Sequence, residues 1–481
     1  MSLLTPPNFP DKRKGRAVVL GAGPTGLSTA WRLALHGWKV TVLEKEKELG
    51  GHGGTRHLHG YNVDDGPHKL YPQVEIAKEM IQHFVGDDLL TTSKKSMIYL
   101  NGKYIPFPFG IVDLFRGLGL LGGIRSGLSY TLGKVQKLRK GKTKTYTDYV
   151  ISLYGRYPHE LVFRQVAKKI WGNPDWLDVK LAETRIISPS LVDLLKSLFT
   201  GGIKNKPKLS ADQFYYPRHG LRQLWEAMWS ETVRHGGILH RSAQPTVVKR
   251  NGAKYTVDYL GKNGRKQSIV ADVVVSTIPL RTLFSMTQPA PPINLEESIE
   301  GLNATSLLML YVVVNAPRLL TANWIFYPES KYHFGRISEQ KGFSEEMIPK
   351  DRTVLMVEIP FARREIQVMD RKRLLAETVA QLREVGVLKP KHTILDQFTA
   401  FDEAIYPKYD LAWKEKLDRI LAYTDKQSGL YLNGRHGLFC YNNMDHSMEM
   451  GVMLADHIAS GAKITDWKKA REHFYEYRIV D

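Results

Sequence analysis

The sequence predicts an α/β protein in which a parallel-sheet domain is interrupted by a second domain that is largely helical and mixed α+β. Three observations support this fold class. The chain has 481 residues, which is too long for one ordinary hydrophobic core. Residues 17–44 show a strand, a glycine-rich turn, a helix and a second strand in succession. Residues 238–279 and 432–461, far along the chain, have the strands and the helix that would complete the same sheet.

The first βαβ unit spans residues 17–44. The apolar run 17–20 is typical of a buried parallel strand, and GAGPTG follows it at once. The next residues, LSTAWRLALHG, predict a helix that ends at Gly37, and KVTVLE predicts a second strand that ends at Glu44. Strand, glycines, helix, strand and terminal acid in this order indicate a Rossmann-type dinucleotide site.

Each glycine of this motif has a mechanical reason. Gly21 allows the tight turn, Gly23 lets the backbone approach a pyrophosphate, and Gly26 lets the helix pack close to the strand. The helix N-terminus then faces the phosphates, and the terminal acid accepts a hydrogen bond from a ribose hydroxyl. The predicted dinucleotide-binding residues of this unit are Gly21, Gly23, Pro24, Thr25, Gly26, Glu44 and Lys45.

A second glycine pair, Gly50-Gly51, follows the second strand and precedes His52. A nicotinamide dinucleotide does not need this pair, whereas an extended FAD needs small residues beneath its pyrophosphate and ribityl chain. The arrangement resembles the glutathione-reductase-type FAD proteins, in particular the branch of amine oxidases, protoporphyrinogen oxidase and UDP-galactopyranose mutase. The resemblance implies a glutathione-reductase-type FAD-binding Rossmann domain, with FAD as cofactor and Gly50, Gly51 and His52 among its contacts.

Two later segments are expected to complete the FAD domain. Residues 238–279 alternate as β-strands, turn at Asn251-Gly252 and end in the strand ADVVVSTIP. In the resembling families this block places a strand beside the adenine, here near Val247 and Val248. Residues 432–461 predict a strand, a polar turn and a helix, whose N-terminus would point at the flavin. The expected contacts at that N-terminus are Asn443, Met444 and Asp445.

The predicted organisation is therefore discontinuous. FAD-binding segments are expected at residues 1–86, 215–290 and 419–481, with a helical substrate-domain insertion at 87–214 and a second substrate segment at 291–418.

Several motifs resemble UDP-galactopyranose mutases more closely. DDGPHKLYP resembles the mutase loop over the flavin, so the resemblance places Gly66 and His68 beside the isoalloxazine. NGKYIPFPFGI, residues 101–111, resembles the strand pair that leads into the mutase helical domain. YGRYPHELVFRQVAKKIWGNP resembles the mutase segment that ends in a tryptophan beside the substrate, here Trp171.

Two arginines follow from the same resemblance. Fourteen residues after that tryptophan, mutases have an arginine on the substrate diphosphate, here Arg185; GRHGLFCYNNMD places a second one at Arg435. Planar guanidinium groups pair bidentately with phosphate oxygens. The resemblance implies catalytic roles for Arg185, Arg435, Tyr441 and His68, and substrate contacts for Trp171, Arg185, Tyr216, Arg435, Phe439 and Tyr441.

The departures from the mutase pattern leave the reaction open. Asn443 stands where mutases have an acid before methionine, with Asp445 two residues on, and the region after Arg185 matches poorly. One hypothesis is a mutase-like enzyme that acts through flavin N5 on a nucleotide-linked or phosphorylated sugar. The alternative is an oxidase or desaturase of the protoporphyrinogen-oxidase or amine-oxidase type, with a large, partly apolar, membrane-delivered substrate. In a third interpretation, the arginines only form structural ion pairs. The sequence has no His/Cys cluster that indicates a metal.

The net charge of the chain predicts what kind of molecule or surface it binds. The net charge of +19 indicates an anionic small-molecule substrate or an anionic membrane surface, and nothing resembles a nucleic-acid module. No acid occurs between Asp113 and Asp148, whereas the basic segment Arg125–Lys144 is rich in lysine. This segment predicts either peripheral contact with an anionic membrane or a solvated helix. The single Cys440 and the lack of a bilayer-long apolar run favour a cytoplasmic protein, peripheral at the inner face of the membrane if it binds lipid.

Overall fold

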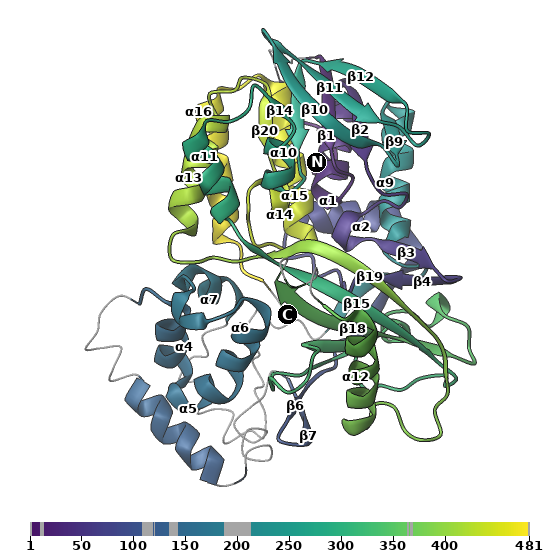
Figure 1. The fold of residues 1–481 in the computed structure, drawn as a ribbon. Helices are drawn as coiled ribbons and strands as arrows, with labels where there is room; N and C mark the ends of the chain where they lie inside the picture. The colour runs from purple at the N-terminus through teal and green to yellow at the C-terminus, as the bar shows by residue number, and fades with distance from the viewer. Residues whose placement is uncertain are drawn as a thin grey trace.

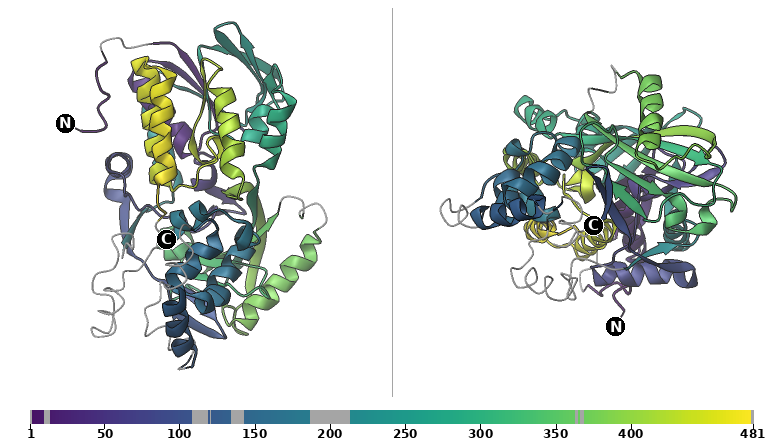
Figure 2. Two further views of the ribbon diagram at one scale, coloured as in Figure 1. Left: turned by 90° about the vertical axis from the view of Figure 1, so that its left-hand side faces the viewer. Right: turned by 90° about the horizontal axis from the view of Figure 1, so that it is seen from below.

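The computed structural model describes residues 2–9, 14–107, 119, 121–133, 143–186, 213–362, 365 and 369–479. A parallel-sheet domain lies at one end of the molecule, and a mixed sheet with a group of helices beside it lies at the other (Figure 1). The two further views show that these helices lie next to the mixed sheet rather than over the parallel one (Figure 2).

The parallel sheet has the strand order β20-β13-β1-β2-β9, and each neighbouring pair in it is parallel. Its central strand β1 is buried from Ala17 to Leu20, as expected for a strand that is covered on both faces. The strands are β1 (Arg16–Leu20), β2 (Lys39–Glu44), β9 (Ile238–Arg241), β13 (Val273–Ser276) and β20 (Leu430–Leu432).

Helices α1 (Pro24–Leu35) and α15 (Met444–Ser460) pack tightly against each other beside this sheet. Their backbones meet at Gly451, where a Cβ would lie 2.6 Å from the carbonyl oxygen of Thr25. Only glycine permits this approach, so the last helix of the chain is held against the first. Helix α9 (Arg222–Arg234) contacts both α1 and α2 (Glu75–Val85).

A four-stranded sheet, β12-β11-β10-β14, extends from the parallel domain. The hairpin between β10 and β11 turns at Gly252 and Ala253, one residue later than the predicted Asn251-Gly252, because Asn251 still pairs with Lys254. Gly252 has the positive φ of 63° that such turns favour. The strands are β10 (Gln244–Asn251), β11 (Lys254–Leu260), β12 (Lys266–Ala271) and β14 (Thr287–Gln288).

The substrate domain is built on a seven-stranded sheet with the order β19-β15-β18-β17-β16-β6-β7. Strand β15 is buried on both faces because its alternate residues enter two different hydrophobic clusters: Met309 and Tyr311 lie in the main core, whereas Leu308 and Leu310 lie in the second core, near helix α12 (Arg371–Glu384). The strands are β6 (Ser96–Leu100), β7 (Lys103–Pro106), β15 (Ala304–Val314), β16 (Trp324–Phe326), β17 (Arg336–Glu339), β18 (Thr353–Ala362) and β19 (Ile394–Pro407).

The helical part of the substrate domain comes from residues 121–186. Its elements are a helix over 121–133, then α4 (Tyr146–Tyr154), α5 (Arg156–Pro158), η3 (His159–Phe163), α6 (Arg164–Ile170), η4 (Pro174–Trp176) and α7 (Val179–Arg185). The remaining main elements are β3 (Thr55–Leu58), β4 (Tyr61–Asp64), β5 (Leu89–Ser93), β8 (Gln213–Pro217), α10 (Leu280–Phe284), α11 (Ile293–Gly301), α13 (Trp413–Thr424), α14 (Gly434–Gly437) and α16 (Ile464–Glu472).

The predicted fold class, a glutathione-reductase-type Rossmann domain with an inserted substrate domain, is confirmed. The segment boundaries differ in two places. Residues 89–106 form the strands β5, β6 and β7 rather than helices, and in β6 Ser96, Ile98 and Leu100 are buried at every second position. Helices α11 and α13 contact each other, and α13 also contacts β20 of the parallel sheet, so both helices belong with the FAD domain. The second substrate segment is therefore shorter at both ends than the predicted residues 291–418: it begins after α11 and ends before α13.

The basic segment Arg125–Lys144 is described only in part, because residues 134–142 lie outside the described residues. Among the described residues, no helix is long and apolar enough to cross a membrane. Peripheral contact with an anionic membrane stays a prediction.

Candidate active site

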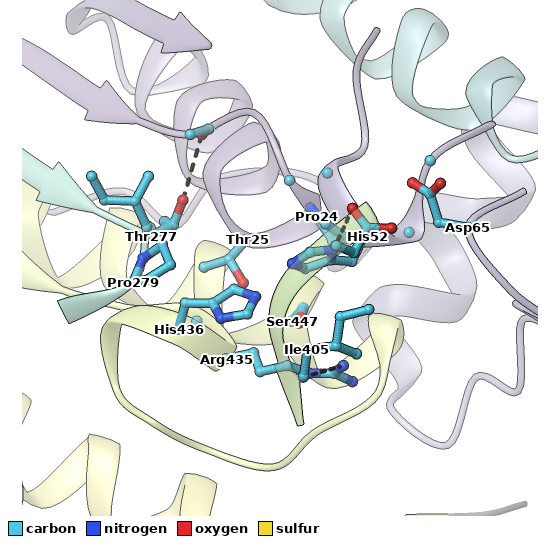
Figure 3. Close-up of a pocket in the computed structure, with 18 of the residues that line it drawn as sticks. Pro24, Thr25, His52, Asp65, Thr277, Pro279, Ile405, Arg435, His436 and Ser447 are labelled. Carbon is cyan, nitrogen blue, oxygen red and sulfur yellow. Dashed lines mark hydrogen bonds and ion pairs between the residues drawn. The ribbon is translucent and has the colours of Figure 1, made fainter. Parts of the chain in front are cut away.

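A cavity of about 790 Å³ lies between the parallel-sheet domain and the substrate domain. This volume is within the range of small-molecule sites, which is roughly 300–1,000 Å³. Figure 3 shows residues of the β1–α1 turn, the loop after β2 and the α14–α15 region gathered around it. The predicted residues that line it are Gly21, Gly23, Pro24, Thr25, Glu44, Lys45, Gly51, His52, Gly66, His68, Arg185, Arg435, Tyr441, Asn443 and Met444.

The glycine turns form a cradle of bare backbone at one end of the cavity. A Cβ on Gly23 would have the carbonyl oxygen of Gly50 as its nearest neighbour, 4.0 Å away, so it would enter open space. A Cβ on Gly51 would lie 3.3 Å from Cα of Gly23, so the two turns face each other. Helix α1 begins at this point without a side-chain cap, which leaves its first N–H groups for an anion. These residues fit the pyrophosphate of a dinucleotide.

Gly26 and Gly50 support the cradle without lining it. A Cβ on Gly26 would lie 2.0 Å from the Gly21 carbonyl oxygen, so glycine is required for close helix–strand packing. Gly50 has a φ of 106°, its N–H donates to the Ala22 carbonyl at 2.9 Å, and a Cβ there would collide with Trp225. Neither glycine lines the cavity, and the close backbone packing explains why both positions are glycine.

The carboxylate of Glu44 is held at the rim of the cradle. It accepts hydrogen bonds from the backbone N–H groups of Ala22 at 2.7 Å and Glu46 at 2.9 Å. Burial raises the pKa of Glu44, and these two donors act in the opposite direction. Each carboxylate oxygen has a second lone pair, so Glu44 can still accept a hydrogen bond from a ribose hydroxyl.

The strand β10 meets the cavity at its beginning. Gln244, Pro245 and Thr246 line the cavity, whereas Val247 and Val248, which were expected beside the adenine, do not. The register of β10 against β11 shifts between Pro245 and Val247, where the part of the strand that lines the cavity ends.

The N-terminus of α15 points into the cavity through Asn443, Met444 and Ser447. The backbone N–H of Asn443 donates to Nδ1 of His446 at 3.2 Å, which holds this helix start in place. Asp445 does not line the cavity, because its buried carboxylate accepts from the backbone N–H of Gln73 at 2.9 Å.

The loop of Gly66 and His68 passes along the cavity wall. Gly66 has a φ of 130°, which a residue with a side chain rarely adopts. Burial, together with the positive charges of Arg435 and Arg336, lowers the pKa of His68 to about 3. The imidazole is therefore neutral at physiological pH, and its Nδ1 has no hydrogen-bond partner among the described residues.

Arg185 and Tyr441 form the first part of a cluster at the other end of the cavity. Nη1 of Arg185 donates to the hydroxyl of Tyr441 at 2.7 Å. The guanidinium also lies 5.4 Å from the ring centroid of Trp171 and 5.2 Å from that of Tyr441, within cation–π range. The ring of Tyr406 stacks on that of Tyr441, with centroids 5.9 Å apart.

Arg435 and Arg336 complete this group, which we call the arginine–tyrosine cluster (Arg185, Arg336, Arg435, Tyr406 and Tyr441). Arg435 donates to the carbonyl oxygens of Ile405 and Asn442, and its guanidinium lies 5.8 Å from the Tyr441 ring centroid. Arg336 instead forms a two-point ion pair with Glu358, at 2.7 and 2.9 Å, and donates to the Tyr406 hydroxyl at 3.3 Å. All five side chains line the cavity.

Three residues predicted as substrate contacts do not line the cavity. Trp171 is buried beside the cluster, where its ring contacts Arg185. Phe439 is buried and faces Tyr409, with ring centroids 6.0 Å apart. Tyr216 is fully buried and donates to the carboxylate of Asp64.

Sequence reasoning predicted His52 but missed the rest of a second polar group on the cavity wall, which consists of Arg56, Asp65, Asp402 and His436. Arg56 pairs with both Asp65, at 2.5 Å, and Asp402, and Nδ1 of His52 lies 3.5 Å from the Asp402 carboxylate. Burial and the nearby Asp402 raise the pKa of Asp65. His436 lies beside His52, with ring centroids 5.0 Å apart. Asp65 directly precedes Gly66 in the DDGPHKLYP motif, so it could have been found, whereas nothing local in the sequence identifies Asp402.

Comparison with known proteins agrees with this site. Residues 24–436 match the family described as flavin containing amine oxidoreductase. A 4,4'-diaponeurosporene oxygenase of Staphylococcus aureus is 23% identical over 376 residues, which cover 71% of this chain and 70% of that protein. An L-amino-acid oxidase of Crotalus adamanteus is 24% identical over 290 residues, which cover 58% of this chain and 54% of that protein.

The solved structures that share the fold include a mutase and a putative oxidase. A reduced UDP-galactopyranose mutase superposes with a TM-score of 0.80 at 18% identity, over 95% of this chain and 97% of that one. A putative protoporphyrinogen oxidase from Exiguobacterium sp. 255-15 has a TM-score of 0.67 at 18% identity, over 95% and 100% of the two chains. The cofactor of this chain is FAD, and the glycine cradle fits it. The chain therefore belongs to the flavin containing amine oxidoreductase family.

Proposed function

We propose that this FAD-dependent enzyme is mutase-like and acts on an anionic, nucleotide-linked or phosphorylated sugar. The observation that supports this most directly is the arginine–tyrosine cluster. Among the described residues, the hydrogen-bond acceptors of Arg435 are Asn442 and Ile405, which are uncharged. An arginine whose partners are neutral leaves a positive charge for a ligand, whereas Arg336 is neutralised by Glu358.

The cluster has the chemistry of a phosphate site. Arg185 and Arg435 project planar donors into one cavity, and such donors match phosphate oxygens bidentately. The hydroxyl of Tyr441 accepts from Arg185, and a phenol hydroxyl can donate as well as accept, so Tyr441 has the chemistry to contact a phosphate oxygen beside Arg185. These groups would hold the substrate and stabilise the negative charge that develops as a phosphate or diphosphate leaves.

FAD supplies a nucleophilic N5 when it is reduced and a hydride acceptor when it is oxidised. The role of the protein in the mutase reaction would be to orient the sugar between this cofactor and the arginine–tyrosine cluster. Neutral His68, on the loop beside the cavity, would complete the wall without adding a second positive charge. The similarity in fold to the reduced UDP-galactopyranose mutase supports this proposal.

The second candidate is an oxidase or desaturase with a larger, partly apolar substrate. Leu307, Phe401 and Ile405 line the same cavity and give part of its wall an apolar character. The 4,4'-diaponeurosporene oxygenase, whose match covers most of this chain, also favours this candidate.

The decisive experiment compares the oxidised and dithionite-reduced holoenzyme with a panel of nucleotide sugars that includes UDP-galactopyranose. For a mutase, we expect the ring form of the sugar to change only with reduced enzyme, without net oxidation. Arg435→Ala should abolish this activity and retain FAD, whereas Arg419→Ala, an exposed arginine on α13 that pairs with Glu415, should behave as wild type. Bleaching of oxidised flavin by a substrate, with oxygen consumption on recovery, would instead establish the oxidase.

A further inference from the structure

The second polar group on the cavity wall contains two buried carboxylates that share one arginine. We call these three residues the double-aspartate group (Arg56, Asp65 and Asp402). The side chain of Asp65 is 1% exposed and that of Asp402 is 6% exposed. Nε of Arg56 lies 2.5 Å from Oδ1 of Asp65, and its Nη2 donates to Oδ1 of Asp402. All three side chains line the cavity, so the group faces whatever the cavity holds.

One carboxylate oxygen of this group has no protein partner. Oδ1 of Asp402 accepts from Arg56 and lies 3.5 Å from Nδ1 of His52, whereas the buried Oδ2 has no hydrogen-bond partner among the described residues. Burial opposes the ionisation of Asp402, but His52 and Arg56 together lower its pKa below the usual value, so this carboxylate is ionised. A buried, ionised oxygen without a donor is costly, so we expect a ligand in the cavity to supply the missing hydrogen bond.

The same group has donors beside this acceptor. Arg56 contacts the two carboxylates through Nε and Nη2, so the donors of its Nη1 remain for a ligand. A hydroxyl group both donates and accepts, and a chain of hydroxyls therefore matches an acceptor and donors that lie side by side. A cationic ligand does not match, because Arg56 already offsets negative charge here and Arg435 enters the same cavity with uncharged partners.

The double-aspartate group adjoins both the glycine cradle and the loop of His68. His52, which lies beside Asp402, directly follows Gly51 of the cradle. Asp65 directly precedes Gly66 of the loop. His52 and Asp65 are both drawn in the view of the cavity (Figure 3). A ligand that extends from the cradle along the cavity wall would pass this group.

A buried network fixes the backbone next to Asp65. The carboxylate of Asp64 accepts from Thr55 at 2.6 Å and from Tyr216, and the hydroxyl of Tyr311 donates to the Asp64 carbonyl oxygen at 2.9 Å. These partners come from β3, β8 and β15, so they hold Asp64 from both domains. The position of the next side chain, Asp65, on the cavity wall is therefore set by the core.

We propose that the double-aspartate group is a polyol subsite, which hydrogen-bonds the hydroxyl groups of a ligand in the cavity with Oδ2 of Asp402 as the principal acceptor. Two ligands of this enzyme carry such hydroxyls: FAD in its ribityl chain, and the proposed substrate in its sugar. The ribityl source rests only on the cofactor, whereas the sugar source rests on the proposed function.

The test compares Asp402→Asn with a matched control, Glu226→Gln. Both changes turn an arginine-paired carboxylate into an amide, but Glu226, which pairs with Arg241, does not line the cavity. FAD-stripped protein is titrated by calorimetry with FAD, with ADP, which has no ribityl chain, and with an FAD analogue that has an alkyl chain in place of the ribityl chain. Reduced FAD-loaded protein is titrated with UDP-galactopyranose and with UDP.

The two sources give different results. If the ribityl chain is the ligand, Asp402→Asn should bind FAD about tenfold more weakly than wild type, and should bind ADP and the alkyl analogue as tightly as wild type. If the sugar is the ligand, the variant should bind UDP-galactopyranose about tenfold more weakly and UDP as tightly as wild type. Glu226→Gln should match wild type with every ligand.

Unchanged affinity of Asp402→Asn for both FAD and UDP-galactopyranose would overturn the proposal. An equal loss for ADP or UDP would also overturn it, because the effect would then belong to the rest of the nucleotide. If wild type binds no nucleotide sugar, the proposed function fails, but the FAD titrations still decide the polyol subsite. Circular dichroism verifies folding, and Asp65→Asn, at the other carboxylate, takes the place of Asp402→Asn if that variant does not fold.

Discussion

Gly23→Asp should separate cofactor binding from folding. Gly23 has a φ of −76°, so a side chain adds no backbone strain, and its Cβ would enter open space. Gly23 is also the N-cap of α1, which has no side-chain cap. Aspartate is a favoured N-cap residue and should stabilise the FAD-free protein by a few tenths of a kcal/mol relative to glycine.

The same carboxylate would face the FAD pyrophosphate. Two unit charges about 4 Å apart near a protein surface repel by about 4 kcal/mol, which corresponds to about a thousandfold loss of FAD affinity. We therefore expect a colourless protein whose melting temperature equals or exceeds that of the FAD-free wild type.

The assay is flavin absorbance of the purified protein, with FAD titration and thermal unfolding of the stripped forms. Gly23→Ala controls for volume without charge and should retain most FAD. Gly127→Asp, at another glycine where a Cβ meets nothing within 4 Å, controls for the aspartate itself. If Gly23→Asp retained stoichiometric FAD, the assignment of this turn to the pyrophosphate would be refuted. If the variant failed to fold, the argument that its side chain enters open space would be wrong.

Three further predictions test the cavity and its supports. Arg185→Lys keeps the charge but loses the planar donors and the bond to Tyr441. The activation free energy derived from kcat/KM should therefore rise by about 1.5–3 kcal/mol with FAD retained, and an unchanged kcat/KM would exclude Arg185 from substrate binding. His68 has a folded pKa of about 3, below its unfolded value of about 6.5, so the unfolded state takes up a proton first as the pH falls. The wild type should therefore lose stability as the pH falls from about 6.5 to about 4, and His68→Gln should lose less, by up to about 1.4 kcal/mol per pH unit in urea titrations. An identical pH dependence of wild type and variant would contradict the burial of a neutral imidazole at this position. Lys169 donates to the carbonyl oxygens of Tyr327, Glu329 and Phe334, so Lys169→Met should destabilise the protein by about 3 kcal/mol in thermal unfolding. The control is Lys168→Met, at the exposed neighbouring position, which should melt as wild type. Equal melting temperatures of the two variants would show that the three bonds of Lys169 make no net contribution to stability.

The cofactor half of the site was predictable because its determinants are local. The turn of Gly21 and Gly23 and the acid at the end of β2 depend on neighbours within one βαβ unit, so their spacing in the sequence is also their geometry. Arg185, Arg435 and Tyr441 were found only through resemblance, and the structure brings them into one cavity. Tyr216 and Phe439 were selected in the same way and are buried elsewhere, since a motif gives a residue type but not the direction of its side chain.

Other features were decided only by tertiary packing. Arg56 meets Asp402 across 346 positions of sequence, and Arg336 meets Tyr406 through the order of strands in the mixed sheet. The composition of the basic segment Arg125–Lys144 predicted either a membrane contact or a solvated helix, but only the packing of Gly133 on α4 determined that Leu121, Leu128 and Leu132 face outward. Helix rotation and strand order depend on which surfaces bury the most apolar area together, and that is a property of the whole chain rather than of any one segment.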